Sequence, residues 1–234
     1  MLFKDPFGFI SAYLSCKSPS GRVVELRSGL KICLSEHPHD VISVFVIFVR
    51  EDYGRIQPGS IVVDVGANIG IFSLYAAQNR VARVFAYEPN SESYDYLLQN
   101  IKANHLDQVI VPGQFAVVDT PGEPVRFPTK SSMYNAIITN DNTTDFEWVS
   151  TIGLPEILDQ TGDIHLLKLD CEGAEYSILF SAGEDVYALI QNIRLEYHLG
   201  REQDIENYLV QHGFVKCYSK VDTANSGNMW YEKG

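Results

Sequence analysis

Apolar runs and helical patterns alternate between residues 61 and 197, and this alternation limits the fold more than any other feature of the sequence. The runs are almost continuously apolar, as strands are when helices cover both faces of a parallel sheet. They lie at 61–65, 84–87, 164–169 and 190–197. Helical patterns follow them at 69–78, 91–101 and 174–182. This order predicts an α/β fold that is doubly wound around a mostly parallel sheet.

The middle and the two ends of the chain follow other patterns. Residues 109–111 and 115–118 are interpreted as one more strand, interrupted by Pro112 and Gly113. Residues 120–145 are interpreted as an edge strand with a long loop that forms an active-site wall. Residues 214–219 and 229–232 are expected to pair as a closing antiparallel hairpin. We expect one domain over residues 56–234, and an N-terminal extension, 1–55, that serves as a lid or as a substrate or dimer contact.

The first strand ends in a loop, Asp64-Val-Gly-Ala-Asn-Ile-Gly70, that leads into the first helix. Gly66 and Gly70 permit a tight turn and a close approach of a ligand to the backbone. Free N–H groups at the helix start suit a carboxylate, and the Asp64 carboxylate suits an ammonium group. Glu88, at the end of the second strand, can accept hydrogen bonds from two ribose hydroxyls. These features favour S-adenosylmethionine as the cofactor. The site expected around it also includes Ala67, Asn68, Ala116 and Asp170.

A dinucleotide site is the alternative for this loop. The dinucleotide fingerprint G-x-G-x-x-G requires glycine where Asn68 stands. In addition, an acidic residue two positions before Gly66 would repel a pyrophosphate. An NAD-dependent oxidoreductase is therefore disfavoured. A non-catalytic module that binds the nucleotide cofactor without transferring a group stays open, because fold alone does not decide function.

Polar residues also follow two later strands. Asp170 ends the run 164–169, while Glu196 and His198 end the run 190–197. We expect these residues to meet at the carboxyl edge of the sheet, where doubly wound folds bind ligands. All three are candidate catalytic residues, with His198 near its ordinary pKa as a general base, and all three are candidate ligands of Mg²⁺. Glu172 and Glu175 are expected in the first turn of the next helix, where the helix dipole favours negative charge.

Four stretches together resemble the FkbM family of S-adenosylmethionine-dependent methyltransferases. They are VVDVGANIGIFSLYAA (62–77), AYEPNSESYDYLLQNIKAN (86–104), LLKLDCEGAEYSIL (166–179) and IRLEYH (193–198). The combination of DVGANIG with the KxDxEGAE block is the specific part, and Cys171 stands where the family usually carries valine. The resemblance implies a class I methyltransferase (Rossmann-like) fold with a seven-stranded sheet. It also implies O-methylation of hydroxyls on secondary metabolites, sugars or glycans, while residues 120–150 and the extension match no motif that would identify the acceptor.

Composition limits the partners. The formal net charge is −12, which argues against a nucleic acid and against an anionic membrane surface. The longest apolar run, 41–49, is far shorter than the roughly 20 residues of a membrane-spanning helix. Four scattered cysteines and no signal peptide indicate reduced thiols in the cytoplasm. We expect a small-molecule or glycan hydroxyl acceptor as the partner, and a homo-oligomer stays open.

Overall fold

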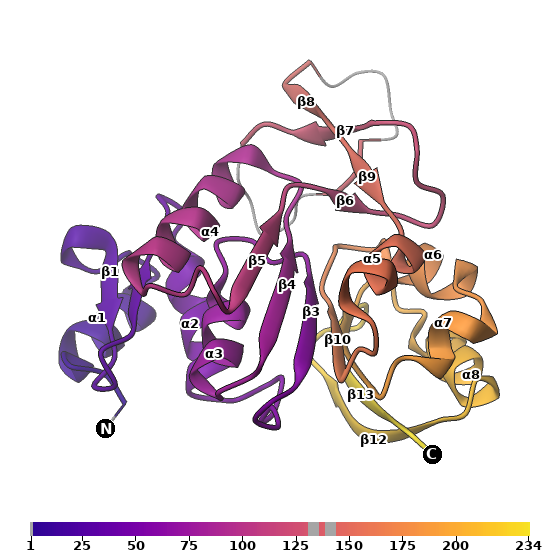
Figure 1. Cartoon of the computed structure of the whole chain (residues 1–234). Helices are drawn as coiled ribbons and strands as arrows, with labels where there is room; N and C mark the ends of the chain where they lie inside the picture. The colour runs from indigo at the N-terminus through magenta and orange to yellow at the C-terminus, as the bar shows by residue number, and fades with distance from the viewer. Residues whose placement is uncertain (1, 131–135, 139–143) are drawn as a thin grey trace.

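The structure is a computed structural model that describes residues 2–130, 136–138 and 144–234. Its centre is a seven-stranded sheet in the order β12-β13-β11-β10-β3-β4-β5 (Figure 1). The strands are β3 (Ile61–Val65), β4 (Arg83–Tyr87), β5 (Ile110–Gly113), β10 (Leu166–Leu169), β11 (Asn192–Tyr197), β12 (Phe214–Val221) and β13 (Gly227–Lys233). Strands β5, β4, β3, β10 and β11 are parallel, and β13 pairs antiparallel with β11 and β12. This confirms the doubly wound α/β fold and its closing hairpin.

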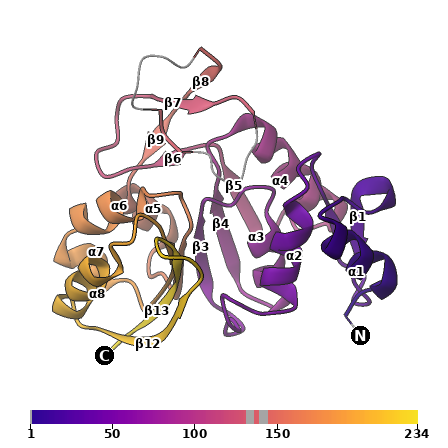
Figure 2. The same cartoon turned by 180° about the vertical axis from the view of Figure 1, so that it is seen from behind.

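Helices cover both faces of this sheet, as Figures 1 and 2 show from opposite sides. Side chains alternate along each strand, so Val62 and Val84 enter one buried cluster while Val63 and Phe85 enter another. On the first face lie α2 (Asp40–Phe48), α3 (Ile71–Gln78) and α4 (Ser91–Ala103). On the second lie α5 (Leu154–Thr161), α6 (Glu175–Ser181), α7 (Glu184–Ala188) and α8 (Glu202–Gln211). None of the helices described has the length and apolarity needed to cross a membrane.

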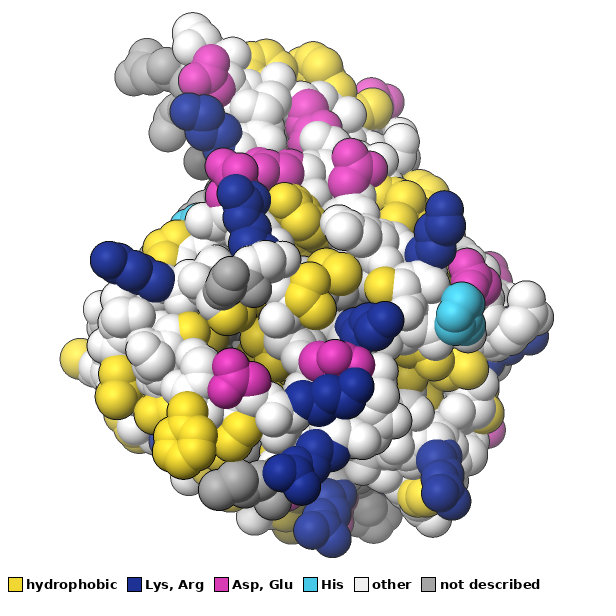
Figure 3. Space-filling model, turned by 90° about the vertical axis from the view of Figure 1, so that its left-hand side faces the viewer, with side chains coloured by type: hydrophobic (Ala, Val, Ile, Leu, Met, Phe, Trp, Pro, Cys, Tyr) yellow, Lys and Arg dark blue, Asp and Glu magenta, His cyan; other side chains and the backbone are white. Residues whose placement is uncertain are grey.

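The N-terminal extension packs onto the first face of the sheet. Its elements are α1 (Pro6–Ser15), the 3-10 helix η1 (Ser20–Arg22), β1 (Val23–Glu25), β2 (Lys31–Cys33) and α2. Asp5 caps α1 by accepting a hydrogen bond from the backbone N–H of Gly8. Leu26 and Val44 are fully buried in the same cluster as Val62, so the extension shares the core of the sheet. Figure 3 shows this side of the molecule, where hydrophobic, basic and acidic side chains are intermingled.

Two small sheets stand beyond the carboxyl ends of the central strands (Figure 1). β6 (Ala116–Val117) pairs in parallel with β9 (Thr151–Ile152), and β7 (Val125–Pro128) pairs antiparallel with β8 (Phe146–Val149). We call these four strands the flap. The prediction that 115–118 continues the strand of 109–111 is wrong. Pro112 and Gly113 still belong to β5, an edge strand that tolerates proline, and the chain then leaves the sheet. The predicted strand within 120–145 corresponds to β7, while 131–135 and 139–143 of the predicted loop lie outside the described residues.

Candidate functional site

A cavity of about 480 Å³ lies at the carboxyl ends of β3, β4, β10 and β11. Its residues come from the loop after β3 and the start of α3, the strand ends, the flap, the segment around α2 and the turn between β12 and β13. Of the predicted site residues, those that line it are Gly66, Ala67, Asn68, Glu88, Ala116, Asp170, Glu196 and His198. Asp64 and Gly70 are not among the lining residues.

The loop after β3 is fixed by close backbone packing. Gly66 has φ 74°, and a Cβ atom added to it would lie 1.9 Å from the carbonyl oxygen of Asp170. No side chain fits there, so this glycine lets the loop touch the end of β10. Gly70 has φ 86°, and its added Cβ would lie 2.5 Å from Leu97 Cδ1. Gly70 therefore serves the packing of α3 against α4, while Gly66 allows the loop to pack against the backbone after β10.

Glu88 lies at the end of β4 with 6% of its surface exposed. Its Oε2 accepts a hydrogen bond from the Asn68 backbone N–H (2.8 Å), and its Oε1 accepts one from the Asn90 backbone N–H (2.9 Å). Burial raises the pKa of Glu88 to about 7, because desolvation disfavours the charged carboxylate. Each oxygen retains a further lone pair, so the carboxylate can still accept two ligand hydroxyls at the cavity wall.

Asp64 takes part in a buried ion pair beneath the loop. Its side chain is fully buried, Oδ1 lies 3.0 Å from Lys168 Nζ, and Oδ2 accepts a hydrogen bond from Ser73 Oγ at 2.7 Å. Lys168 stands directly opposite Asp64 on the neighbouring strand β10. Its Nζ also donates to the carbonyl oxygen of Gly66 at 2.8 Å and lies 3.7 Å from Asp170 Oδ2. The structure thus ties Asp64 to the loop geometry through Lys168, and it places the Asp64 carboxylate away from the cavity.

His198 is held by a carboxylate that is itself fixed. Nδ1 of His198 lies 3.2 Å from Oε1 of Glu175, whose side chain is fully buried. The two Glu175 oxygens accept hydrogen bonds from the backbone N–H groups of Cys171 and Gly173, both at 2.8 Å. With Nδ1 directed at Glu175, Nε2 faces Glu172 at 3.5 Å and Glu196 at 4.0 Å. The sequence interpretation of Glu175 as a helix-start carboxylate is confirmed, but it gave no sign of this contact with His198.

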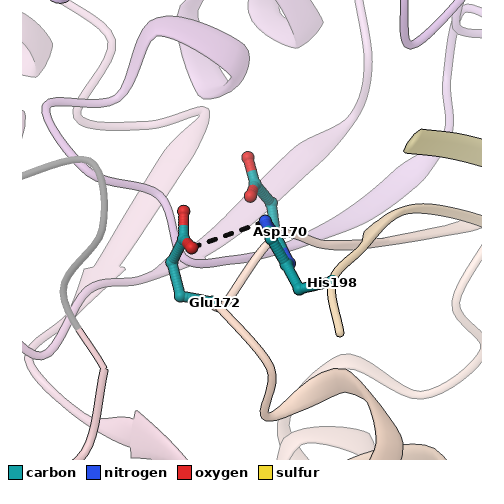
Figure 4. Close-up of side chains that lie close together, drawn as sticks. All are labelled: Asp170, Glu172 and His198. Carbon is teal, nitrogen blue, oxygen red and sulfur yellow. Dashed lines mark ion pairs between the residues drawn. The ribbon is translucent and has the colours of Figure 1, made fainter. Parts of the chain in front are cut away.

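Glu172 differs from its expected place in the first helical turn. Helix α6 begins only at Glu175, and Glu172 has a left-handed φ of 52° in the turn before it. The side chain consequently lines the cavity beside Asp170 and His198 (Figure 4). One ligand atom each of Asp170, Glu172 and His198 lies within 4.8 Å of the others. This trio could hold a metal ion, whereas the sequence had named Glu196 in place of Glu172.

The electrostatics of this end of the cavity are dominated by carboxylates. Burial lowers the pKa of His198, but the hydrogen bond and charge of Glu175 and the charge of Glu172 outweigh it and raise the value to about 9. Burial, reinforced by the charge of Asp170, raises the pKa of Glu196 to about 8. Burial likewise raises the pKa of Glu172 to about 7. The premise that His198 has its ordinary pKa is therefore wrong, and its imidazolium form is favoured at neutral pH.

The N-terminal extension reaches the cavity through Tyr53, which sequence reasoning missed. Tyr53 is 3% exposed, and its hydroxyl donates a hydrogen bond to Asp170 Oδ2 at 3.0 Å. Lys168 Nζ lies 5.7 Å from the centre of its ring, within the range of a cation–π contact. Ile42 and Ile47 of α2 line the same wall. The extension therefore completes a cavity whose floor and far wall belong to the sheet.

The comparisons with known proteins agree with this arrangement. A family model described as the methyltransferase FkbM domain matches residues 64–216. Methyltransferase sdnD of Sordaria araneosa is 26% identical over 198 residues, which cover 70% of this chain and 76% of that protein. Ribosomal protein L11 methyltransferase of Bacillus cytotoxicus is 28% identical over 108 residues, which cover 46% of this chain and only 33% of that protein.

Solved structures show the same fold. The putative tRNA (m1A22) methyltransferase Sp1610 of Streptococcus pneumoniae, in complex with S-adenosyl-L-methionine, has a TM-score of 0.52 at 17% identity, over 79% of this chain and 71% of that one. The tRNA m1G37 methyltransferase of M. jannaschii has a TM-score of 0.52 at 11% identity, over 91% of this chain and 57% of that one. At these identities the likeness concerns the class I methyltransferase fold alone. The family match over residues 64–216, together with the cavity at the strand ends, shows that the chain belongs to the FkbM family of S-adenosylmethionine-dependent methyltransferases.

Proposed function

We propose that this methyltransferase transfers a methyl group to a hydroxyl oxygen of a small metabolite, sugar or glycan. The observation that carries the proposal is the pair of Glu175 and His198 at the cavity wall. A fully buried carboxylate holds Nδ1 of His198 at 3.2 Å and turns Nε2 toward the other side chains of the cavity. A histidine oriented in this way by a second group is the usual form of a general base that takes a proton from a hydroxyl.

The residues of the cavity fit S-adenosylmethionine. The absence of a side chain at Gly66 leaves the loop in contact with the end of β10, and we assign the cofactor to Gly66, Ala67, Asn68, Glu88, Ala116 and Asp170. Glu88 would accept the ribose hydroxyls, as acidic residues at the end of the second strand do in related nucleotide folds. Asp64, assigned to the cofactor site from sequence, would act from beneath through Lys168 and the carbonyl oxygen of Gly66. The bound cofactor supplies an electrophilic methyl group on a sulfonium.

The protein's tasks are then to position an oxygen and to take up its proton. Positioning of two reactants can lower a barrier by several kcal/mol. Nε2 of His198 would take the proton, while Asp170, fixed by the Tyr53 hydroxyl, is the alternative base. A positive charge bound beside His198 lowers its pKa and so favours the neutral form that can act as a base.

A second candidate mechanism uses a divalent cation at Asp170, Glu172 and His198. Two carboxylates and an imidazole suit Mg²⁺ less well than an all-oxygen set. The contact of His198 with Glu175 favours this candidate, because metal-binding histidines usually donate their other N–H to a carboxylate. Such an ion would lower the pKa of a bound hydroxyl. Loss of turnover on chelation and its return with added Mg²⁺ would support this candidate over the metal-free base.

We argue the chemical class of the acceptor from the charge of the protein. The net charge of −12 disfavours a polyanion, because proteins that bind nucleic acids need an excess of Lys and Arg on the binding surface. The names of the similar solved structures refer to tRNA, but a likeness in fold does not carry a substrate.

The test is His198→Asn, with His105→Asn as the matched control on the exposed turn after α4. We expect methyl transfer by His198→Asn to fall by about 10²–10⁴, the usual contribution of a positioned acid–base group. Its affinity for S-adenosylhomocysteine should stay near that of the parent, because the loss is in the transition state. Full activity in both His198→Asn and Asp170→Asn would refute both the general-base mechanism and the metal mechanism. In the metal mechanism Asp170→Asn should be the more damaging, since Mg²⁺ prefers a carboxylate to an imidazole.

A further inference from the structure

The wall of the cavity farthest along the sheet is formed by β11, β13 and the turn before β13. Its side chains share one property, which is that each presents an oxygen that can accept a hydrogen bond. They are Glu196, Asp222, Thr223, Ser226 and Asn228. No part of the methyl-transfer mechanism above uses this wall.

Asn228 is the unusual member of the wall. It is 3% exposed, and it stands directly opposite Glu196 in the ladder between β11 and β13. Side chains at directly opposed positions lie on the same face of a sheet, so both border the cavity. Asn228 Nδ2 donates to Asp222 Oδ2 at 3.0 Å, while Asn228 Oδ1 is buried and has no hydrogen-bond partner among the described residues. A buried acceptor without a donor is costly and rare in folded proteins. Because Asn228 lines the cavity, a ligand bound there is a candidate donor for this oxygen.

The positive side chains of the cavity are already engaged. Among the described residues that line it, the lysine and arginine side chains are Lys168 and Arg50. Lys168 is paired with Asp64, and Arg50 with Asp52 and, at 3.8 Å, with Asp222. Glu196 meets His198 Nε2 only at 4.0 Å, while that nitrogen lies closer to Glu172. Glu196 thus shares the His198 imidazolium, at 4.0 Å, with the closer Glu172. An anionic acceptor would find no unengaged lysine or arginine among the described residues that line the cavity.

We infer that Glu196 and Asn228 form a subsite for a protonated amino group of the acceptor molecule, which would therefore be an amino alcohol or an amino sugar. An ammonium offers three N–H donors and a positive charge. These match the unpaired Asn228 Oδ1 and the side chain of Glu196, whose ionised form a bound ammonium favours. His198 lies two residues beyond Glu196 on the same strand end, so a hydroxyl near the amino group would face the base. The inference rests on the proposed function, whose acceptor class it narrows.

The experiment compares matched acceptors. Each amino alcohol or amino sugar, glucosamine among them, is tested against its N-acetyl and hydroxyl counterparts. Inhibition constants are measured against the transfer reaction, and dissociation constants on the enzyme loaded with S-adenosylhomocysteine. We expect the free amine to bind at least tenfold more tightly than either counterpart. Equal binding within every pair, or preference for neutral or anionic members, overturns the inference.

Variants locate the effect. Glu196→Gln and Asn228→Leu should each reduce the preference for the amine at least fivefold and leave the affinity for S-adenosylhomocysteine unchanged. Glu232→Gln, on the same strand β13 but exposed at its other end, is the matched control and should behave as the parent. If Glu196→Gln instead weakens S-adenosylmethionine more than S-adenosylhomocysteine, the wall serves the sulfonium and the inference fails. It also fails if the preference disappears with a chelator.

The position of the new methyl group separates this inference from the proposed function. O-methylated amine products support both. N-methylated products, with the amine preference still lost in Glu196→Gln, would refute the proposed O-methylation and keep the amine subsite. O-methylated neutral products without any amine preference would keep the proposed function and refute the subsite.

Discussion

Glu88 should make cofactor binding depend on pH. Burial holds its pKa at about 7 in the free protein. Ribose hydroxyls donate to the carboxylate form, so binding favours ionisation, and the proton must leave when the cofactor enters. Below the pKa the affinity should therefore fall about tenfold per pH unit, which gives S-adenosylhomocysteine roughly tenfold weaker binding at pH 6 than at pH 8.

The same shift affects the stability of the free protein. Because the folded-state pKa lies above the ordinary value of 4.5, the folded state binds the proton more tightly than the unfolded chain does. The contribution of Glu88 to folding is therefore most favourable below about pH 4.5. It declines as the pH rises to about 7, by about 3 kcal/mol in all. A bound cofactor should reduce this decline, since it stabilises the ionised form.

Isothermal titration calorimetry of S-adenosylhomocysteine at pH 6, 7 and 8 measures the effect. Runs in two buffers of different ionisation enthalpy count the proton that is released. Glu88→Gln keeps the size of the side chain and removes the titration, so its affinity should be weaker at pH 8, by about 1.5–3 kcal/mol, and flat with pH. Glu92→Gln, exposed in the first turn of α4, is the matched control. A pH dependence that survives in Glu88→Gln, or equal affinity at pH 6 and 8 in the parent, would refute the reasoning.

Three further substitutions test the supports of the site. Lys168→Met leaves the buried Asp64 carboxylate without its cation, so urea denaturation should show that the free energy of unfolding falls by about 3–5 kcal/mol. Adding Asp64→Asn to this variant should restore part of the lost stability. A fall below about 1 kcal/mol in Lys168→Met would contradict the pairing. Gly66→Ala forces a Cβ atom against the carbonyl oxygen of Asp170, 1.9 Å away, so calorimetry should show no cofactor binding, and binding near the parent's would show that the loop shifts freely. Tyr53→Phe removes the hydrogen bond to Asp170, which should lower stability by about 1 kcal/mol and reduce turnover, while unchanged turnover would leave Tyr53 a packing residue.

The strand ends were predictable because short-range patterns encode them. The run 61–65 is followed by a loop in which position 66 requires glycine. Parallel strands also place their carboxyl ends at one edge of the sheet. Glu88, Asp170 and His198 could therefore be assigned to one edge from the sequence. The pairing of Asp64 with Lys168 was harder, since it depends on the register of β10 against β3 across about a hundred residues. A pattern along the chain carries no information on such a register.

The contact between Glu175 and His198 escaped prediction for a related reason. A regular helix starting near Glu172 would make both glutamates ordinary first-turn carboxylates. The chain instead takes a left-handed conformation at Glu172 and at Gly173, which delays α6 and turns Glu172 into the cavity. Gly173 was the local signal that could have indicated this turn. The flap pairs β7 with β8 across the long segment between them, so its pairing was likewise beyond local patterns.

Tyr53 shows why residues 1–55 cannot be understood apart from the sheet. Its ring packs against Phe72 of α3, with ring centres 5.1 Å apart, and its hydroxyl fixes Asp170 at the end of β10. The apolar side chains of α2 that hold this segment in place are buried in the core under β3 and β4. In the sequence, the apolar run 41–49 served only to argue against a membrane-spanning helix, and it did not predict that α2 packs onto the sheet. The same packing of α2 thus covers one face of the sheet and completes the cavity. A substitution that loosens α2 in the core should therefore also disturb the position of Asp170, through Tyr53.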